Sequence, residues 1–273
     1  MNFSVCMSVY RNDYPEHVRT ALESITKKQT VKPSEVVLVV DGPVPEELSA
    51  LITEYENRQP ELFHVIRLEK NGGLGNALRL CVENARYGVC ARMDSDDVAA
   101  ADRFEKQVNY MEAHPKVDIV GGQITEFVDN EENVAGRRNV PLDDKSIKEY
   151  MKSRCAFNHM TVMFRKDSVL KAGNYQDWFW NEDYYLWLRM MLAGCLFGNL
   201  PETLVNVRGG REMYARRGGW RYFRSEAKLQ YYMYCNGIIG GGYLLINIAK
   251  RLIVQVLLPN RLRGWVFRTF ARS

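Results

Sequence analysis

The stretch ARMDSDDVAAADRF, residues 91–104, places three aspartates within four positions directly after an apolar run. That run, residues 88–93, is typical of a strand buried inside a sheet. Like charges repel, so Asp94, Asp96 and Asp97 would have raised pKa values unless a counter-charge were present. Mg²⁺ or Mn²⁺ would supply one, because these hard cations bind carboxylate and phosphate oxygens together. In an alternative interpretation, Asp96 or Asp97 caps the next helix and the others face solvent.

Strand-like and helix-like segments alternate along the first two-thirds of the chain, which predicts an α/β fold with a largely parallel sheet covered by helices. The segment EVVLVV, residues 35–40, is typical of a strand buried on both faces. Asp13 looks like a helix N-cap, with Glu16 three positions later. The expected strands cover 3–9, 35–40, 64–68, 88–93, 119–122 and 160–164, the expected helices about 14–25, 48–55, 74–85, 103–113 and 183–193, and an irregular acidic stretch 129–133.

The composition is that of a globular protein. Of the 273 residues 46% are hydrophobic and 26% charged, which suits one large domain, or one domain with an appendage, and excludes disorder. The six cysteines lie far apart and form no Cys-x-x-Cys pair, so we expect a reducing, cytoplasmic setting. The N-terminal residues MNFSVCMSVYRND show no features of a secretory signal.

Charge is distributed unevenly along the chain. From Arg208 to the end there are 13 Lys and Arg against two Glu, whereas residues 1–207 carry a net charge of −7. This change predicts a boundary near Arg208 and an anionic partner for the basic tail, residues 209–273. Nucleic acid, anionic lipid and pyrophosphate all qualify on charge alone.

Polar residues also stand near the ends of other predicted elements. Asp41 follows the strand 35–40, and Asn71-Gly72-Gly73 precedes a helix. Ligands of open α/β sheets bind outside the carboxyl ends of the strands, so we expect these groups beside the aspartates of residues 94–97. The glycines would let a phosphate approach backbone N–H groups at a helix N-terminus, although a plain turn and helix start explains them too. The spacing of the dinucleotide fingerprint is absent.

A second acidic site lies in WFWNEDYYLW, residues 178–187, where Glu182 and Asp183 stand among aromatic residues. Partial desolvation raises the pKa of a carboxyl group and suits a general base. Aromatic faces are also a common platform for sugar rings. A helix start with core aromatics is the alternative explanation for the same residues.

Six segments together resemble the family 2 glycosyltransferases, inverting enzymes of the GT-A fold, and most of all the bacterial members that build O-antigen, capsule or exopolysaccharide. The segments stand in the family's order and the similarity spans about residues 3–208. They are SVCMSVYRND (4–13), VVLVVDG (36–42), NGGLGNAL (71–78), ARMDSDDVAAADRFEKQ (91–107), HMTVMFRKD (159–167) and NEDYYLWLRM (181–190).

The resemblance implies transfer of a hexose or N-acetylhexosamine from a UDP-sugar donor, with inversion, to a saccharide acceptor linked to polyprenyl diphosphate. It implies a divalent cation, Mn²⁺ or Mg²⁺, as cofactor and no nucleic-acid partner. Residues 1–208 would be the GT-A catalytic domain, with a nucleotide-sugar half of about 1–122 and an acceptor half of about 123–208. Residues 209–273 would be a helical basic tail.

Site residues follow from the resemblance position by position. Asp96 and Asp94 would bind the cation on the diphosphate, and Asp183 would be the base, with Glu182 as an alternative or an acceptor contact. Trp178, Trp180 and His159 would contact the acceptor. The nucleotide-sugar contacts would be Val9, Tyr10, Asp41, Asn71, Gly72, Gly73, Leu74, Arg92, Asp94, Ser95, Asp97, Arg208 and Arg211.

One segment departs from the family pattern. Many relatives carry a histidine soon after an arginine at the end of the domain, but residues 207–211 read VRGGR. Phosphate contact by Arg208 or Arg211 is still expected. His159 could replace the missing histidine, although a single histidine before a strand is more often structural.

The tail segment 243–258 is largely apolar, with Asn247, Lys250, Arg251 and Gln255 on one arc of a helical wheel. Its sixteen residues would extend about 24 Å as a helix, which is too short to span a bilayer. We expect it to lie on the cytoplasmic face of the membrane, helped by basic and aromatic residues near the C-terminus, or else to pack on the catalytic domain.

Two other functions fit parts of the pattern. A nucleotidyltransferase acting on sugar phosphates also uses aspartates and a divalent cation, but should carry a basic, glycine-rich loop after the first strand. That place holds Tyr10-Arg11-Asn12-Asp13. A non-enzymatic protein that binds anionic lipid or RNA through the tail would show a steep dependence of binding on salt.

Overall fold

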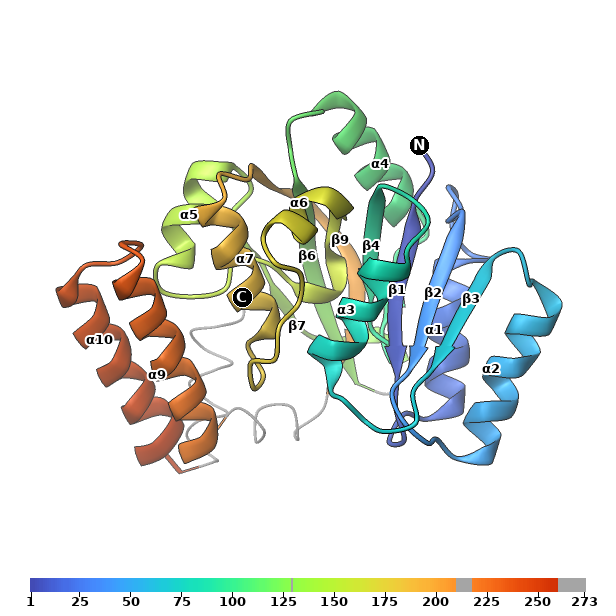
Figure 1. The fold of residues 1–273 in the computed structure, drawn as a ribbon, viewed down its shortest axis with the longest axis horizontal. Coiled ribbons are helices and arrows are strands. Elements are labelled where there is room, and N and C mark those ends of the chain that lie inside the picture. The colour runs from blue at the N-terminus through green and yellow to red at the C-terminus, as the bar shows by residue number, and fades with distance from the viewer. Residues whose placement is uncertain (129, 210–217, 260–273) are drawn as a thin grey trace.

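The computed structural model describes residues 1–128, 130–209 and 218–259. Within these ranges one sheet has the strand order β3-β2-β1-β4-β8-β6-β9-β5, and β7 pairs with β6 (Figure 1). Strands β1 to β4 run parallel, whereas β8 is antiparallel to β4 and β6. The strands are β1 (Ser4–Val9), β2 (Glu35–Val40), β3 (Phe63–Arg67), β4 (Val89–Met93), β5 (Val98–Ala99), β6 (Ile119–Val128), β7 (Asn130–Arg138), β8 (Met163–Arg165) and β9 (Phe197–Arg208).

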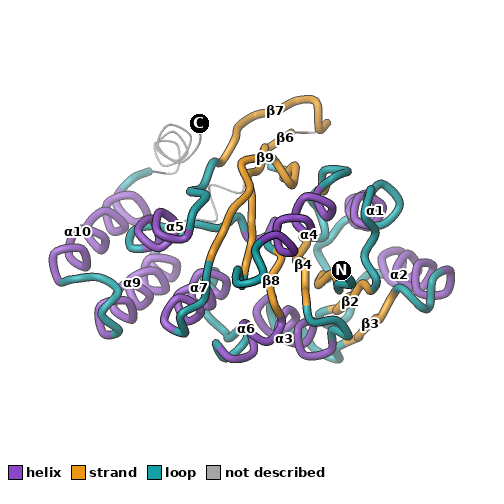
Figure 2. The backbone as a smooth tube through the Cα atoms, turned by 90° about the horizontal axis from the view of Figure 1, so that it is seen from above, coloured by secondary structure: helices purple, strands orange, loops and turns teal. Residues whose placement is uncertain are grey.

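Helices cover both faces of this sheet, which confirms the predicted α/β class; Figure 2 shows α1 and α3 on opposite sides of the strands. One face carries α1 (Pro15–Ile25), α2 (Glu46–Arg58) and α4 (Arg103–Ala113). The other carries α3 (Leu74–Asn84), α5 (Asp144–Met151), α6 (Lys166–Lys171) and α7 (Glu182–Leu192).

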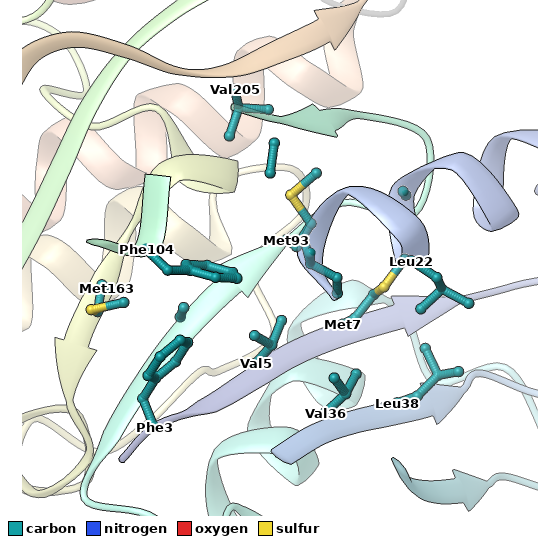
Figure 3. Packing of buried hydrophobic residues seen from close by; sticks show 14 of the residues in the cluster. Phe3, Val5, Met7, Leu22, Val36, Leu38, Met93, Phe104, Met163 and Val205 are labelled. Atoms are coloured by element: carbon teal, nitrogen blue, oxygen red, sulfur yellow. The ribbon is translucent and has the colours of Figure 1, made fainter. Parts of the chain in front are cut away.

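Side chains of the central strands alternate between the two faces, as the two-residue period of a strand requires. Each face of the sheet carries a cluster of buried hydrophobic side chains, the first beneath α1, α2 and α4 and the second beneath the helices of the other face. Val5 and Met7 of β1 point into the first cluster, where they lie near Leu22 of α1 and Phe104 (Figure 3). Cys6 between them belongs to the second cluster, beneath α3. Both faces of β1 and β2 are therefore buried, and the chain must place its polar residues at the strand ends.

Two further helices, α9 (Trp220–Cys235) and α10 (Gly241–Leu252), lie on the side of the molecule away from β3 (Figures 1 and 2). A π-helical turn, Ile253–Leu257, continues α10. The boundary expected near Arg208 coincides with the end of β9, yet Leu229 and Met233 of α9 belong to the second hydrophobic cluster. In the described part of the chain, no helix combines the length and apolar character that crossing a bilayer requires.

Three details differ from the expectations. Helix α1 begins at Pro15 without a side-chain cap, because Asp13 instead accepts a hydrogen bond from the Tyr10 N–H. The strand expected over 160–164 begins only at Met163, since residues 159–161 form a 3₁₀ turn. Residues 130–133 of the expected irregular stretch belong to β7. Their polar sequence does not indicate a strand, but backbone pairing with β6 holds them as one.

Candidate functional site

The carboxyl ends of the central parallel strands open into a first cavity of about 720 Å³. The structure brings together there the polar groups expected at one edge of the sheet, including Asp41 after β2 and the acidic turn after β4. Other predicted site residues that line it are Tyr10, Asn71, Gly72, Gly73, Leu74, Asp94, Ser95, Asp96, Trp178, Trp180 and Glu182.

The acidic turn concentrates negative charge. One carboxylate oxygen from each of Asp94, Asp96 and Asp97 lies within 4.8 Å of the others. Burial, and then the charges of Asp94 and Asp13, raise the pKa of Asp96 to about 6. Burial and the charges of Asp96 and Asp94 raise the pKa of Asp97 well above its usual value. The repulsion expected from the sequence is present, and an all-carboxylate donor set fits a hard divalent cation.

Two arginines hold this turn in place. Arg92 is only 2% exposed and lines neither cavity described here; its guanidinium donates to Asp94, so it acts on the site through that carboxylate. At the end of β9, the backbone N–H of Arg208 donates to Oδ1 of Asp97 at 2.9 Å, and its Nε donates to the carbonyl of Asp96 at 3.2 Å. Helix α4 begins at Arg103, so the interpretation of Asp96 or Asp97 as its cap is wrong.

Asp13 is a site residue that the sequence reasoning missed. Its Oδ2 accepts hydrogen bonds from the Tyr10 N–H and the Ser95 hydroxyl, both at 2.9 Å. Burial raises the pKa of Asp13 to about 6, and Asp94 contributes to the rise. Asp13 therefore links the loop after β1 to the acidic turn. Its position just before a proline-initiated helix is what made it look like a cap.

Asp41 organises the glycine-containing loop. Its carboxylate accepts from the N–H groups of Gly72 at 2.7 Å and Gly73 at 2.9 Å, and from the Asn71 side chain at 2.9 Å. The N–H groups of Gly72 and Gly73 are therefore engaged by a carboxylate of the chain itself, and the approach of a phosphate to N–H groups at this helix N-terminus stays a prediction. Gly42 next to it has φ +86°, and a Cβ there would lie 2.6 Å from the Asn71 nitrogen, so only glycine fits.

A second cavity, of about 540 Å³, adjoins the first. Leu74, Trp180 and Glu182 line both cavities, so these three residues form the partition between them. Asp183 and His159 line the second cavity and Trp178 the first. The two acidic sites noted in the sequence therefore stand in neighbouring cavities that share one wall.

The carboxyl pair at the start of α7 is electrostatically strained. Burial, and then the charge of Asp183, raise the pKa of Glu182 to about 7. Oδ1 of Asp183 accepts a 2.6 Å hydrogen bond from the Tyr184 N–H. Helix α3 can pack close to the start of α7 because its residue 75 is glycine: a Cβ at Gly75 would lie only 3.3 Å from Cβ of Glu182.

His159 is held by its surroundings. Its Nε2 lies 2.9 Å from the Tyr175 hydroxyl, and Nδ1 lies 4.0 Å from Asp183. Burial, assisted by the positive charge of Arg92, lowers the pKa of His159 well below its usual value, so the ring is neutral and forms no ion pair with Asp183. His159 lines the second cavity and not the first, which holds the acidic turn.

The remaining predicted nucleotide-sugar contacts are Val9 and Arg211. Val9 is fully buried in β1, and Arg211 is outside the described residues. Sequence reasoning also missed a basic part of the second cavity, which gathers residues from β7, the segment after α5, and α10. No local motif marks these residues, which are Arg138, Arg154, Lys250 and Arg251.

Comparison with known proteins identifies the family of this chain. The model of "Glycosyl transferase family 2" matches residues 4–172, which hold β1 to β8 and the acidic turn. The chain is a family 2 glycosyltransferase. A second model, "Glycosyl transferase family group 2", matches residues 91–271 of the enzyme. This membership decides against a nucleotidyltransferase and against a non-enzymatic lipid- or RNA-binding protein.

Named relatives cover nearly the whole glycosyltransferase. The amylovoran biosynthesis glycosyltransferase AmsE of Erwinia amylovora is 42% identical over 92% of this chain and 94% of its own. The UDP-Gal:alpha-D-GlcNAc-diphosphoundecaprenol beta-1,3-galactosyltransferase of Escherichia coli is 36% identical over 99% of this chain and 96% of its own. Among solved structures, S. aureus TarS 1-349 in complex with UDP-GlcNAc has a TM-score of 0.67 at 17% identity, and covers 97% of this chain and 79% of its own. The enzyme thus has the GT-A fold expected from the sequence.

Proposed function

We propose that this glycosyltransferase moves a hexose or N-acetylhexosamine from a UDP-sugar to a saccharide linked to polyprenyl diphosphate, in the synthesis of a bacterial surface polysaccharide. The observation that carries the proposal is the shared wall of the two cavities. An acidic, phosphate-compatible site and a carboxyl pair suited to proton abstraction meet at Glu182. The Escherichia coli relative, whose name specifies a UDP-sugar and a diphosphoundecaprenol-linked acceptor, supports these substrate classes.

The first cavity binds the donor. Tyr10, Asp41 and the 71–74 loop hold the nucleoside end, with Asp41 fixing the loop through its hydrogen bonds. Asp94 and Asp96 would hold a divalent cation, which when bound neutralises the diphosphate and stabilises its departure. Arg92 and Arg208 keep the acidic turn in position, so little reorganisation is needed when the donor arrives.

The second cavity binds the acceptor saccharide. The acceptor hydroxyl attacks the anomeric carbon from the side opposite the diphosphate, so the configuration inverts and UDP leaves. Asp183 takes the hydroxyl proton, because its carboxyl group lines the second cavity at the start of α7, beside the wall shared with the donor site. Trp180, on the shared wall and 44% exposed, offers its ring to a sugar.

The acceptor class requires the enzyme to work at a membrane surface, and α10 suits that location. Part of its polar arc packs inward: Asn247 is buried and donates to the Lys152 carbonyl and to Gln230. Its apolar residues point outward, with Leu245 72% exposed and Ile246 55% exposed. An outward apolar face on a basic C-terminal region favours peripheral binding to anionic lipid at the cytoplasmic face.

A donor panel tests the proposal. UDP-sugars and GDP-sugars are offered with synthetic alkyl-diphosphate-linked sugars, with Mn²⁺ or with EDTA, and the anomeric configuration of the product is read by NMR. We expect transfer from a UDP-sugar, inversion, and loss of transfer in EDTA. Asp183→Asn should lower turnover by about 10²–10⁴-fold, whereas Asp167→Asn on exposed α6 should not. Retention of configuration, or no transfer from any UDP-sugar, would contradict the proposal; near-normal turnover by Asp183→Asn would move the base to Glu182.

A further inference from the structure

A histidine ring stands beside the proposed base in the second cavity. His159 and Asp183 both line this cavity, and Nδ1 of His159 lies 4.0 Å from Oδ2 of Asp183. The two residues come from different parts of the chain, His159 from the turn before β8 and Asp183 from the start of α7. The chemistry proposed above gives this ring no part, so its contacts show what it can contribute.

The backbone that carries His159 is fixed by buried hydrogen bonds. His159 begins a 3₁₀ turn. Just before it, the side chain of fully buried Asn158 donates to the carbonyl of Gly122 at 2.8 Å and accepts from Arg138 at 2.7 Å. Inside the turn, the hydroxyl of Thr161 donates to the Asn158 carbonyl at 2.7 Å. The ring of His159 therefore reaches the second cavity from a segment that is anchored on β6.

Tyr175 and Trp187 fix the orientation of the ring. The hydroxyl of Tyr175 lies 2.9 Å from Nε2 of His159, and Tyr175 is only 1% exposed. The ring centroids of Tyr175 and Trp187 lie 5.6 Å and 6.1 Å from that of His159. Trp187 is itself fully buried in α7. The imidazole ring is thus packed on one side and hydrogen-bonded at Nε2, while Nδ1 is directed to Asp183.

These contacts decide which nitrogen of His159 carries the hydrogen. Burial raises the pKa of Tyr175 well above its usual value, so its hydroxyl stays protonated. Within the described residues, that hydroxyl has one hydrogen-bond partner, Nε2 of His159. A buried hydroxyl without an acceptor is destabilising, so Tyr175 donates and Nε2 accepts. Because burial also keeps the His159 ring neutral, its single hydrogen is on Nδ1, which faces Asp183.

We propose that His159 is a positioning residue: held by Tyr175, its Nδ1–H orients the carboxylate of Asp183 for proton transfer from the acceptor hydroxyl. The role of Asp183 as the base rests on the proposed function. The 4.0 Å separation is longer than a hydrogen bond, and contacts in catalytic sites often tighten only when substrate is bound. Each carboxylate oxygen can accept more than one hydrogen bond, so an oriented Asp183 still has a lone pair for the incoming proton.

Nitrogen-15 NMR of the imidazole rings tests the proton position without turnover. The signals of His159 are those that remain when the other three histidines are replaced, His17, His64 and His114, none of which is buried. At neutral pH we expect the hydrogen on Nδ1 and none on Nε2. Tyr175→Phe removes the donor to Nε2 and should give a mixture of the two tautomers. A hydrogen on Nε2 while Tyr175 is in place would overturn the inference.

Two replacements of His159 separate positioning from direct contact with the acceptor. The amide nitrogen of asparagine can take the place of Nδ1, and that of glutamine the place of Nε2, and both donate. We expect His159→Gln to lower kcat about 10–10²-fold with little change in acceptor KM, because the base is no longer oriented. His159→Asn should lose clearly less. His114→Asn, at an exposed position outside both cavities, should change neither constant.

Equal losses of kcat in His159→Asn and His159→Gln would overturn the positioning role. A raised acceptor KM with unchanged kcat would also overturn it, since His159 would then be an ordinary acceptor contact. Circular dichroism identifies a variant that has not folded, and the tautomer measured with His159 unaltered then decides. If the unaltered enzyme transfers no sugar from any UDP-sugar, the proposed function fails whatever the tautomer. If it transfers sugar but the hydrogen lies on Nε2, only this inference fails.

Discussion

The backbone N–H of Arg208 donates a 2.9 Å hydrogen bond to Oδ1 of Asp97, which ties the end of β9 to the acidic turn after β4. Asp97 is 2% exposed, and burial and the neighbouring carboxylates raise its pKa well above the usual value. The basic tail of the sequence begins at the end of β9. The hydrogen bond joins that strand end to the acidic turn in the first cavity. It holds the turn in place while its three carboxyl groups repel one another.

Asp97→Ala should destabilise the protein by about 1–3 kcal/mol, because it leaves the partly buried N–H of Arg208 without its acceptor. Asp97→Asn keeps an acceptor of the same shape and should cost clearly less. Urea unfolding of both variants measures the difference. Equal stabilities of the two variants would show that the hydrogen bond to Arg208 contributes nothing.

Stability should depend on pH through Glu182. Its pKa is raised from 4.5 to about 7 in the folded protein, so the folded chain holds a proton there that the unfolded chain has released. Its stabilising contribution is present below pH 4.5 and is lost as the pH rises through about 7. Glu182→Gln removes this loss, so its stability relative to the unaltered chain should improve between pH 5 and pH 8 by on the order of 1–3 kcal/mol. Urea midpoints at four pH values measure the change, and a constant difference would refute the assignment.

Manganese should stabilise the folded enzyme through the acidic turn. At a free concentration a hundred times the Kd, a ligand that binds only the folded state adds about 2.7 kcal/mol. Thermal unfolding with and without Mn²⁺ should show this gain in the unaltered chain and its loss in Asp96→Asn. Asp167→Asn, an exposed carboxylate on α6, is the matched control. A gain that survives in Asp96→Asn would place the cation elsewhere.

The outward face of α10 should bind anionic vesicles. Changing both Leu245 and Ile246 to Asp should lower co-sedimentation with phosphatidylglycerol-containing liposomes at least tenfold, since burial of each side chain contributes about 1.5–3 kcal/mol. The fold should survive, because both side chains are more than half exposed. Leu192→Asp, a 46% exposed position at the end of α7, should have no effect. Peripheral binding is disproved if the unaltered chain stays in the supernatant.

Much of the fold was predictable because the central strands have distinctive apolar sequences. A run such as EVVLVV, residues 35–40, buries all of its apolar side chains only when both faces of the strand are covered. It is buried throughout in β2. The convergence of Asp41 with the acidic turn followed from parallel strand ends. The acidic turn and the carboxyl pair of α7 were visible because each lies in one of the segments that resemble the family.

Other features depend on contacts that no local pattern encodes. The carboxylate of Asp41 accepts hydrogen bonds from the N–H groups of Gly72 and Gly73, about thirty residues further along the chain, and only the structure shows this pairing. A helical wheel displays the polar arc of α10 but not its direction, and here Asn247 faces the protein. The presence of Arg154 and Lys250 on one cavity depends on the packing of α10 on the segment after α5.

The most direct test of the account is a crystal structure of the enzyme with UDP and Mn²⁺, with the anomalous signal locating the metal. We expect the uracil end beside Asp41 and Tyr10 in the first cavity, with Mn²⁺ between the diphosphate and the carboxylates of Asp94 and Asp96. UDP seated in the second cavity, or an ion bound away from the acidic turn, would contradict the assignment of the donor site and the chemistry derived from it.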